Sequence, residues 1–329
     1  MLRRLRRRER SVVLRYHAVA PDATPETPYA GPDITIPRSL FDAQMRFLCR
    51  AYRPVPLESI IGPVRDGRAP APGTVAVTLD DGYADNFREA LPVLRAHRVP
   101  ATVYVVSETI DEGATLWMSE LRAAVMATAK RSLHVEIGER HEFQLGDPRE
   151  RQVTIKDLTN VLVPVEAPLR RRILATIRKE LGVNGNASLR ETMLSSEQIR
   201  ALHEGGVTIG VHTQTHSNMT LLSPEQVRTE LTVCRDRLES IVGGPVADFA
   251  YPNTGGRFPH FNDEVAGLIR ELGFRSAVTS RPGIVDGSTN PFIVPRIGVA
   301  PRLYREEAFA VTIERYRWLG QPNVGPVNA

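Results

Sequence analysis

Two patterns of apolar and polar positions alternate along this chain. Short runs rich in β-branched and aromatic residues are typical of buried strands, and they occur at residues 12–17, 75–79, 101–106, 206–211, 246–250, 274–279 and 292–294. Between most of these runs the apolar residues recur with helical spacing, at residues 39–48, 57–64, 84–97, 195–203, 224–242 and 262–272. Ser39 is expected to cap the first of these helices. Strands that alternate with helices predict a parallel α/β sheet or barrel.

Residues 107–195 interrupt this alternation. Residues 117–130 and 167–181 have the spacing of amphipathic helices, and residues 131–160 alternate weakly, as in a small β-excursion. We interpret 107–195 as an insertion over one rim of the barrel, where it would act as a lid or a substrate wall. The alternative is that it packs on the side of the barrel and takes no part in a site.

Two adjacent carboxylates, Asp80 and Asp81, follow the strand predicted at Val75–Leu79. Neighbouring side chains on an extended segment point to opposite sides, so these two can share a site only where the strand ends and the chain turns. Gly82 supplies the conformational freedom for that turn. Two anions at the end of a buried strand need a compensating cation, such as a metal ion. Asp-Asp-Gly is also an ordinary turn sequence, so this stretch alone does not establish a site.

Two histidines, His212 and His216, follow the strand predicted at residues 206–211. Histidines spaced in this way at a strand end can converge on one ion, because neutral imidazole is a common metal ligand. One carboxylate with two histidines leaves coordination positions open, which is typical of a catalytic metal site. His17 and Tyr251 also come directly after predicted strands. Because active sites of (β/α) barrels gather at the C-terminal ends of the strands, these positions predict a single site.

Two of these segments resemble the motifs of a known family. Thr78–Gly82 is similar to the first motif of the polysaccharide deacetylases with a NodB homology domain, carbohydrate esterase family 4. His212–His216 is similar to their second motif, His-(Ser/Thr)-x-x-His. The resemblance covers residues 11–300 and implies a distorted (β/α) barrel with an inserted subdomain. The expected organisation is a basic disordered tail, a deacetylase domain and a disordered C-terminal tail, at residues 1–10, 11–318 and 319–329.

The resemblance also implies roles for these residues. Asp81, His212 and His216 would hold a divalent metal ion, with zinc the first choice on ligand type and cobalt or nickel as alternatives. Asp80 would be the general base for a water molecule that attacks the acetyl carbonyl, which the metal polarises. The metal and the backbone N–H of Tyr83 would stabilise the oxyanion. The implied reaction removes the N-acetyl group from an amino sugar, an oligosaccharide or a polysaccharide, giving a free amine and acetate.

The chain departs from the family pattern in two motifs. The third motif of the family carries an arginine that orients the base, but Phe249–Asn253 has none. Arg296 would substitute for that arginine, or it is a surface arginine. The C-terminal Leu-x-His that supplies the acid histidine is also missing, and Leu14–His17 resembles that motif moved to the N-terminus. Because the first and last strands of a closed barrel are neighbours, we expect His17 to be the general acid, with His260 as the competing candidate.

Three aromatic residues are candidates for stacking on sugar rings: Tyr83, Trp117 and Tyr251. Aromatic side chains belong to the core more often than to a binding platform. Of the three, only Tyr251 lies at a position that matches a family motif. Two other functions fit the same residues. One is a deacylase for an O-acetyl ester or a non-sugar amide, and the other is a carbohydrate-binding protein that has lost turnover.

The charge of the chain is concentrated at one end. The 329 residues carry a net charge of +4, and residues 1–10 hold six arginines and one glutamate. The other 36 basic side chains are balanced by 37 acidic ones, a distribution that does not indicate nucleic-acid binding. No segment has the roughly 18 apolar residues of a membrane span or the apolar core of a signal peptide, so we expect a cytoplasmic protein. Weak contact of the arginine tail with an anionic membrane is an alternative for that segment.

Overall fold

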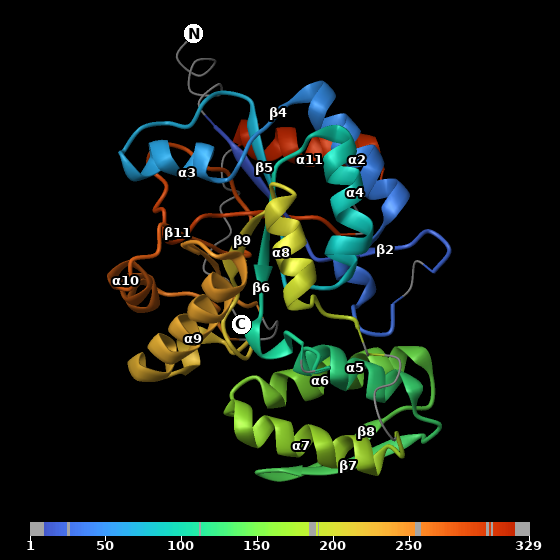
Figure 1. Ribbon diagram of the computed structural model, residues 1–329. Coiled ribbons are helices and arrows are strands. Elements are labelled where there is room, and N and C mark those ends of the chain that lie inside the picture. Colours follow the sequence, from blue (N-terminus) through green and yellow to red (C-terminus); the bar gives the residue numbers. More distant parts are fainter. Residues whose placement is uncertain are drawn as a thin grey trace.

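The computed structural model describes residues 10–24, 27–111, 113–183, 189, 191–253, 258–300, 303 and 305–319. These residues form a curled parallel sheet surrounded by helices, with a further layer at one end (Figure 1). The tails predicted at residues 1–10 and 319–329 lie outside the described residues, except for the residue at the inner end of each. No helix in the described part combines the length and the apolarity of a membrane span.

The central sheet has eight strands and curls into a distorted barrel. The strands are β1 (Val12–Tyr16), β4 (Arg53–Pro54), β5 (Thr74–Leu79), β6 (Ala101–Val105), β9 (Thr208–Val211), β10 (Asp248–Ala250), β11 (Ser276–Val278) and β12 (Ile297–Gly298). Their order is β11-β10-β9-β6-β5-β1-β12, and β4 pairs with the start of β5. Val294 bridges to Val278 of β11, and Ile297 pairs with Leu14 of β1, so the segment after β11 closes the ring. The predicted distorted (β/α) barrel is confirmed.

Most of the helices cover the outside of the barrel, whereas the helix at Glu58–Arg65 packs against the apolar cluster inside it. The helices are α2 (Arg38–Ala51), α3 (Glu58–Arg65), α4 (Leu91–His97) with a π-helical turn before it (Asn86–Ala90), α8 (Ser196–Glu204), α9 (Pro224–Val242), α10 (Asp263–Glu271) and α11 (Glu306–Leu319). Ser195 forms the predicted capping box at the start of α8. The prediction that Ser39 caps the first helix is wrong, because α2 begins at Arg38 and Ser39 donates both its hydroxyl and its N–H to Asp22. Helix α11 was not predicted.

The inside of the barrel changes from apolar to polar along the strands. Alternate residues of a strand face the same side, and the inward apolar cluster includes Val13, Ala76 and Tyr104. Gly210 leaves room for the ring of Tyr104, because a Cβ at this position would lie 2.5 Å from two ring atoms. Further along β1 and β5 the positions in the same alternation are polar, and they are Arg15, His17, Thr78 and Asp80. This change places ionisable groups at the C-terminal rim of the barrel.

The insertion forms its own layer beyond the C-terminal end of β6 (green in Figure 1). It consists of α5 (Trp117–Ala127), an antiparallel hairpin of β7 (Ser132–Ile137) and β8 (Glu139–Gln144), α6 (Pro148–Leu162) and α7 (Ala167–Glu180). These elements bury a separate apolar cluster that includes Leu121, Leu158 and Leu174. The two helices expected in this region are confirmed. The β-excursion expected at residues 131–160 is confirmed only for the hairpin, because residues 148–160 belong to α6, which was not predicted. The boundaries at residues 107 and 195 stay a prediction.

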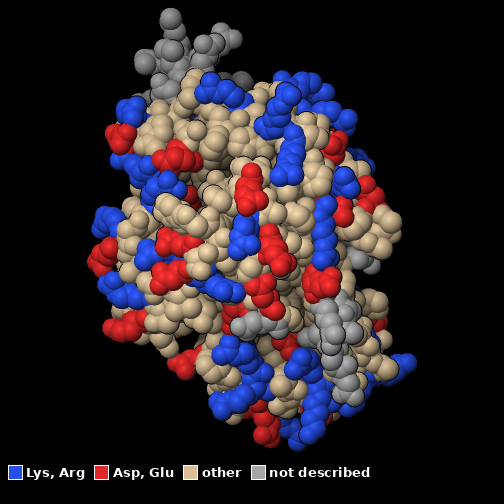
Figure 2. Space-filling model, in the orientation of Figure 1, with Lys and Arg blue, Asp and Glu red and all other residues tan. Residues whose placement is uncertain are grey.

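Basic and acidic side chains are interspersed over most of the face seen in Figure 2. Exposed ion pairs of the structure include Arg228 with Glu271 at 2.7 Å. Exposed pairs of this kind contribute little to stability because water screens them. The surface therefore matches the near balance of charges in the sequence after residue 10.

Candidate active site

One cavity at the C-terminal rim of the barrel brings most of the predicted site residues together. It has a volume of about 440 Å³, and its lining includes His17, Asp80, Asp81, Tyr83, His212 and His216. Helices α5 and α6 of the insertion form part of its wall. Another part is the loop before β3 (Thr35–Pro37), a strand that pairs with β2 (Ala18–Ala20). The insertion thus lines the cavity.

A tight turn after β5 separates the two neighbouring carboxylates. Asp80 continues the strand, and its N–H donates to the carbonyl oxygen of Tyr16 at 3.0 Å. Asp81 and Gly82 both have left-handed backbone, with φ of 79° and 77°. Gly82 also has no room for a side chain, because a Cβ there would lie 3.1 Å from Cγ1 of Val105. As a result, the two carboxylates face different partners.

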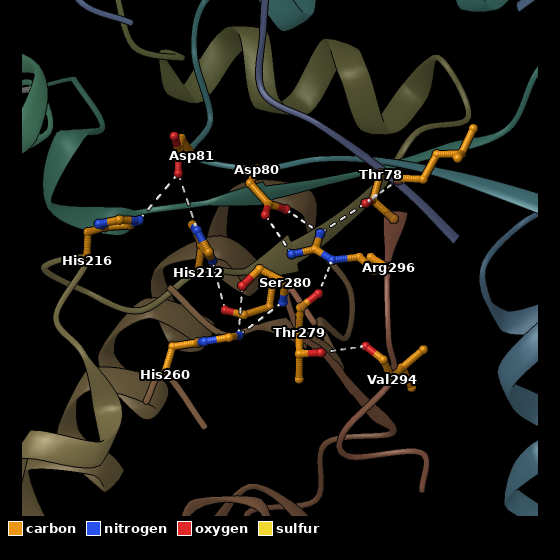
Figure 3. A network of polar contacts seen from close by, with 12 residues as sticks. Thr78, Asp80, Asp81, His212, His216, His260, Thr279, Ser280, Val294 and Arg296 are labelled. Atoms are coloured by element: carbon orange, nitrogen blue, oxygen red, sulfur yellow. Dashed lines mark hydrogen bonds and ion pairs between the residues drawn. The ribbon is translucent and has the colours of Figure 1, made fainter. Parts of the chain in front are cut away.

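Asp80 is held by Arg296, which lies in the segment that closes the barrel. Nη1 and Nη2 of the guanidinium donate to Oδ1 and Oδ2 of Asp80, each at 2.6 Å (Figure 3). The fully buried Arg296 side chain also donates to Oγ1 of Thr78 at 3.0 Å and to the carbonyl oxygen of Thr279 at 2.8 Å. Burial works to raise the pKa of Asp80, but the charge and the hydrogen bonds of Arg296 hold it below its ordinary value. Asp80 is therefore ionised at neutral pH, and Arg296 is not a surface residue.

Asp81 faces the two histidines. Its Oδ1 lies 3.3 Å from Nε2 of His212 and 3.4 Å from Nε2 of His216 (Figure 3). Nδ1 of His212 donates to the carbonyl oxygen of Ala250 at 2.8 Å, which leaves the lone pair of Nε2 directed towards Asp81. Burial lowers the pKa of His216, although the Asp81 carboxylate works to raise it. His216 therefore presents a neutral nitrogen to the carboxylate oxygen that Nε2 of His212 also faces.

The donor set of Asp81, His212 and His216 fits a divalent metal ion. Its ligand atoms all lie within 4.8 Å of one another, and the three side chains are buried. An anionic oxygen opposite the lone pair of a neutral imidazole needs a cation between them. Two imidazole nitrogens and one carboxylate oxygen suit zinc, cobalt or nickel. These three residues are the candidate metal centre.

The loop that carries the histidines, residues 212–217, is held from two sides. Glu230 of α9 accepts hydrogen bonds from the N–H of Thr215 at 2.8 Å and from its hydroxyl at 2.6 Å. Arg170 of α7 donates to the carbonyl oxygen of Thr215 at 3.4 Å and to Oγ of Ser217 at 3.1 Å. Arg170 is only 2% exposed. The insertion therefore contacts the histidine loop directly.

Trp117 belongs to the same contact between the insertion and the histidine loop. The guanidinium of Arg170 lies over its ring, 4.7 Å from the centroid. Its indole N–H donates to the carbonyl oxygen of His216 at 3.4 Å. The prediction that Trp117 stacks on a sugar is wrong, because protein encloses the ring.

The two tyrosines predicted at the site differ in position. Tyr251 is 0% exposed, and its hydroxyl donates to the carbonyl oxygen of Phe292 at 3.0 Å. It belongs to the main apolar core and presents no ring face to a ligand, so its predicted role in substrate binding is wrong. Tyr83 lines the cavity, but it is largely buried, with its hydroxyl 3.3 Å from Oγ of Ser119. The contact predicted between the backbone N–H of Tyr83 and the oxyanion does not involve the side chain, and it stays a prediction.

The two candidate acid histidines also differ. His17 lines the cavity, and its Nδ1 has no hydrogen-bond partner among the described residues. Burial lowers the pKa of His17 to about 4, although the negative charge of the Asp81 carboxylate works to raise it. Nε2 of His260 instead accepts hydrogen bonds from the N–H of Ser280 at 3.2 Å and from its hydroxyl at 2.8 Å. His260 does not belong to the described lining of the cavity, so the geometry favours His17.

Arg15, Tyr29 and Arg170 are among the residues at the site that were not predicted. Arg15 lines the cavity, and its position two residues before His17 on the same strand was a usable signal. Tyr29 lines the cavity from the loop before β3, and its hydroxyl donates to Asp85 at 2.8 Å. Arg170 lies in a helix rich in arginine, whose spacing does not reveal which arginine is buried.

Known sequences were compared with this chain. The family model described as polysaccharide deacetylase matches residues 67–144 and 172–277, which is more than half of the chain. YxkH of Bacillus subtilis (strain 168), whose name describes a polysaccharide deacetylase, is 20% identical over 304 residues. That match covers 92% of this chain and 75% of YxkH.

Solved structures share the fold. The deacetylase PplD of Streptococcus pyogenes, determined in complex with acetate, matches with a TM-score of 0.59 at 19% identity, over 92% of this chain and 97% of PplD. IcaB of Ammonifex degensii matches with a TM-score of 0.57 at 19% identity, over 92% of this chain and 97% of IcaB. At such identities these matches establish a common fold.

Proposed function

Because this chain belongs to the polysaccharide deacetylase family, and is therefore a deacetylase of the hydrolase class, we propose that it removes the N-acetyl group from an N-acetylated amino sugar. The sugar is free or part of an oligosaccharide or polysaccharide. Water attacks the acetamide carbonyl, the C–N bond breaks, and acetate and a free amine leave. One observation carries the proposal: a carboxylate paired with a buried arginine lies beside a carboxylate that faces two histidines in one cavity.

Asp81, His212 and His216 would hold the divalent metal ion, and zinc is our first choice on ligand type. When bound, the ion would act as a Lewis acid on the acetyl carbonyl and on the attacking water. The hydrogen bond from His212 to the carbonyl oxygen of Ala250 supports this role, because it fixes the tautomer and the orientation of the ring. Glu230 and Arg170 support it too, because they hold the loop between the histidines.

Asp80 would take the proton from the attacking water. Each of its oxygens accepts one hydrogen bond from Arg296 and keeps a further lone pair for that proton. The pairing keeps the carboxylate ionised and fixes its orientation, both of which a general base needs. The backbone N–H of Tyr83, at the turn after Asp81, would donate to the oxyanion.

His17 would deliver a proton to the leaving nitrogen. With a pKa of about 4, its ring is neutral before the reaction at pH 7. It therefore acts as an acid only after it has gained a proton in the same cycle, namely the proton that Asp80 has taken from the attacking water. The position of His17 in the cavity supports this role over His260, which lies outside the described lining and accepts hydrogen bonds from Ser280.

The test is acetate release from short N-acetylglucosamine oligomers by metal-stripped protein to which zinc, cobalt or nickel is restored. We expect release that needs the metal and that disappears in Asp80→Asn. Release only from O-acetylated sugars or from a non-sugar amide would show that the substrate is wrong while the deacylation chemistry holds. Binding of the sugars without release from any of these compounds would contradict an enzymatic role and favour a carbohydrate-binding protein.

A further inference from the structure

A cation with no partner lies at the floor of the cavity. Arg15 of β1 lines the cavity beside the two carboxylates. Within the described part of the chain its guanidinium makes no hydrogen bond or ion pair, and its Nε is enclosed by protein. A guanidinium has five N–H donors and no acceptor. Arg15 is partly exposed and only its Nε is enclosed, so Nη1 and Nη2 are placed to meet an anion that enters the cavity from outside the chain.

The neighbouring carboxylates do not supply that anion, because each has other partners. Both oxygens of Asp80 accept from Arg296, and Oδ1 of Asp81 faces the two histidines. Burial, together with the charge of Arg296, lowers the pKa of Arg15 to about 10, which still leaves the guanidinium charged at pH 7. Arg15 is thus a full positive charge directed into the cavity with its donors free.

The closure of the barrel leaves space for this guanidinium. Arg15 pairs with Gly298 of β12, and a Cβ on Gly298 would lie 2.9 Å from Nη2 of Arg15. From the insertion, the exposed Lys156 of α6 and the partly exposed Arg122 of α5 also line the cavity, as does the exposed Asp33, and Arg122 donates to Gln152. Arg15 is the cation at the floor, next to the proposed reaction centre.

We propose that Arg15 binds an acidic group of the substrate, so that the cavity takes an N-acetylated saccharide with a carboxylate or a phosphate close to its acetamide. The inference rests on the proposed function, since it names the substrate class of the same site. A planar guanidinium binds the oxygens of a carboxylate or a phosphate through two parallel hydrogen bonds. In a buried site such charge-assisted bonds distinguish acidic from neutral sugars.

The first experiment measures kcat/KM for acetate release from three N-acetylated compounds in the metal-loaded protein. They are di-N-acetylchitobiose, which is neutral, N-acetylmuramic acid, which carries a carboxylate, and N-acetylglucosamine 1-phosphate. We expect a preference for one or both acidic sugars, and we expect Arg15→Met to reduce the ratio of acidic to neutral kcat/KM by about 10- to 100-fold. The two acidic compounds show whether the group is a carboxylate or a phosphate. An equal loss for all three compounds in Arg15→Met would overturn the proposal.

Two matched variants sharpen the first experiment. Gly298→Ala keeps the charge of Arg15 but crowds its guanidinium, and it should also lower the acidic-to-neutral ratio. Lys156→Met removes a cation at the exposed mouth and should lower the ratio much less, because water screens that charge. A larger effect from Lys156→Met than from Arg15→Met would contradict a binding site at the floor.

A second experiment does not depend on turnover. Calorimetry compares the binding of glucosamine and glucosamine 1-phosphate, which have no acetyl group to lose, and of muramic acid. Tighter binding of the acidic sugars by the unaltered protein than by Arg15→Met supports the proposal even where no acetate is released. Equal affinity of the unaltered protein for acidic and neutral sugars would overturn it.

Discussion

Asp80 and Asp81 are neighbours in the sequence with opposite surroundings. Asp80 faces a permanent cation of the chain itself, with both of its oxygens 2.6 Å from the guanidinium of Arg296. Asp81 faces Nε2 atoms of two histidines at 3.3 and 3.4 Å. The left-handed turn at Asp81 separates the two environments. A carboxylate whose charge is already balanced by an arginine is held ionised and oriented as a base, whereas one that faces the ring nitrogens of two histidines is suited to share an added cation.

The two environments also depend on different parts of the fold. Arg296 reaches Asp80 because the segment before β12 closes the barrel between β11 and β1. The histidines reach Asp81 because their loop is held by Glu230 on the barrel side and Arg170 on the insertion side. Changes in each part should therefore alter one half of the site and spare the other.

The largest effect is expected from Arg296→Met. It leaves the carboxylate of Asp80 buried without its partner, so we expect a loss of about 3–5 kcal/mol in the free energy of unfolding, measured by urea denaturation. Adding Asp80→Asn to Arg296→Met removes the unpaired charge and should restore part of the stability. No recovery in the double variant would show that the loss comes from packing and not from charge.

Replacement of His17 should separate proton transfer from metal binding. His17→Ala should lower kcat for acetate release by about 10²- to 10⁴-fold, the range of a general acid, and leave zinc affinity nearly unaltered. The control is His260→Gln, whose side-chain oxygen still accepts from Ser280, and it should affect kcat far less. A greater loss of kcat in His260→Gln than in His17→Ala would reverse the assignment.

A smaller effect is expected from the insertion. Arg170→Met removes the hydrogen bonds to Thr215 and Ser217, and it should weaken zinc binding by about 10- to 100-fold in calorimetry, as loss of a supporting contact does. Arg171→Met is the matched control, because Arg171 is exposed and pairs with Glu108 at the surface. Equal zinc affinity in the two variants would mean that the insertion does not support the metal centre.

The smallest effect is a dependence of stability on pH. Burial, and then the charges of Arg15, Arg296 and Arg281, lower the pKa of His260 to about 3. The unfolded chain therefore binds one more proton at this residue below pH 6.5, so its contribution to stability is complete above pH 6.5 and declines as the pH falls. Between pH 6 and 4, the free energy of unfolding, measured by urea denaturation at each pH, should fall by about 1.4 kcal/mol less per pH unit in His260→Gln than in the unaltered protein. Identical slopes in the two proteins would contradict a neutral buried His260.

The sequence predicts the fold and much of the site because both depend on local patterns. Residues just past the strand ends, such as Asp81 and His212, meet at one rim once parallel strands form a barrel. The sequence left two alternatives for Arg296, a contact with Asp80 or a position at the surface. The contact depends on closure of the barrel between β11 and β1, which no local sequence pattern shows.

Contacts between distant segments account for most of the errors. Tyr251 follows a strand like the other site residues, but its ring turns into the core. Trp117 was one of three candidates for stacking on a sugar, but its ring meets Arg170, a partner fixed only when the insertion docks on the barrel. The position of a residue after a strand therefore predicts the rim it lies on, but not whether its side chain faces the cavity or the core.

The division between Asp80 and Asp81 is the central claim, and a calorimetric titration of zinc tests it most directly. Metal-stripped Asp80→Asn and Asp81→Asn are compared with the unaltered protein, with acetate release measured on the same samples. We predict that Asp80→Asn binds zinc with nearly unaltered affinity and releases no acetate, whereas Asp81→Asn loses more than about 100-fold in zinc affinity. Loss of zinc binding in Asp80→Asn, or its retention in Asp81→Asn, would contradict the claim.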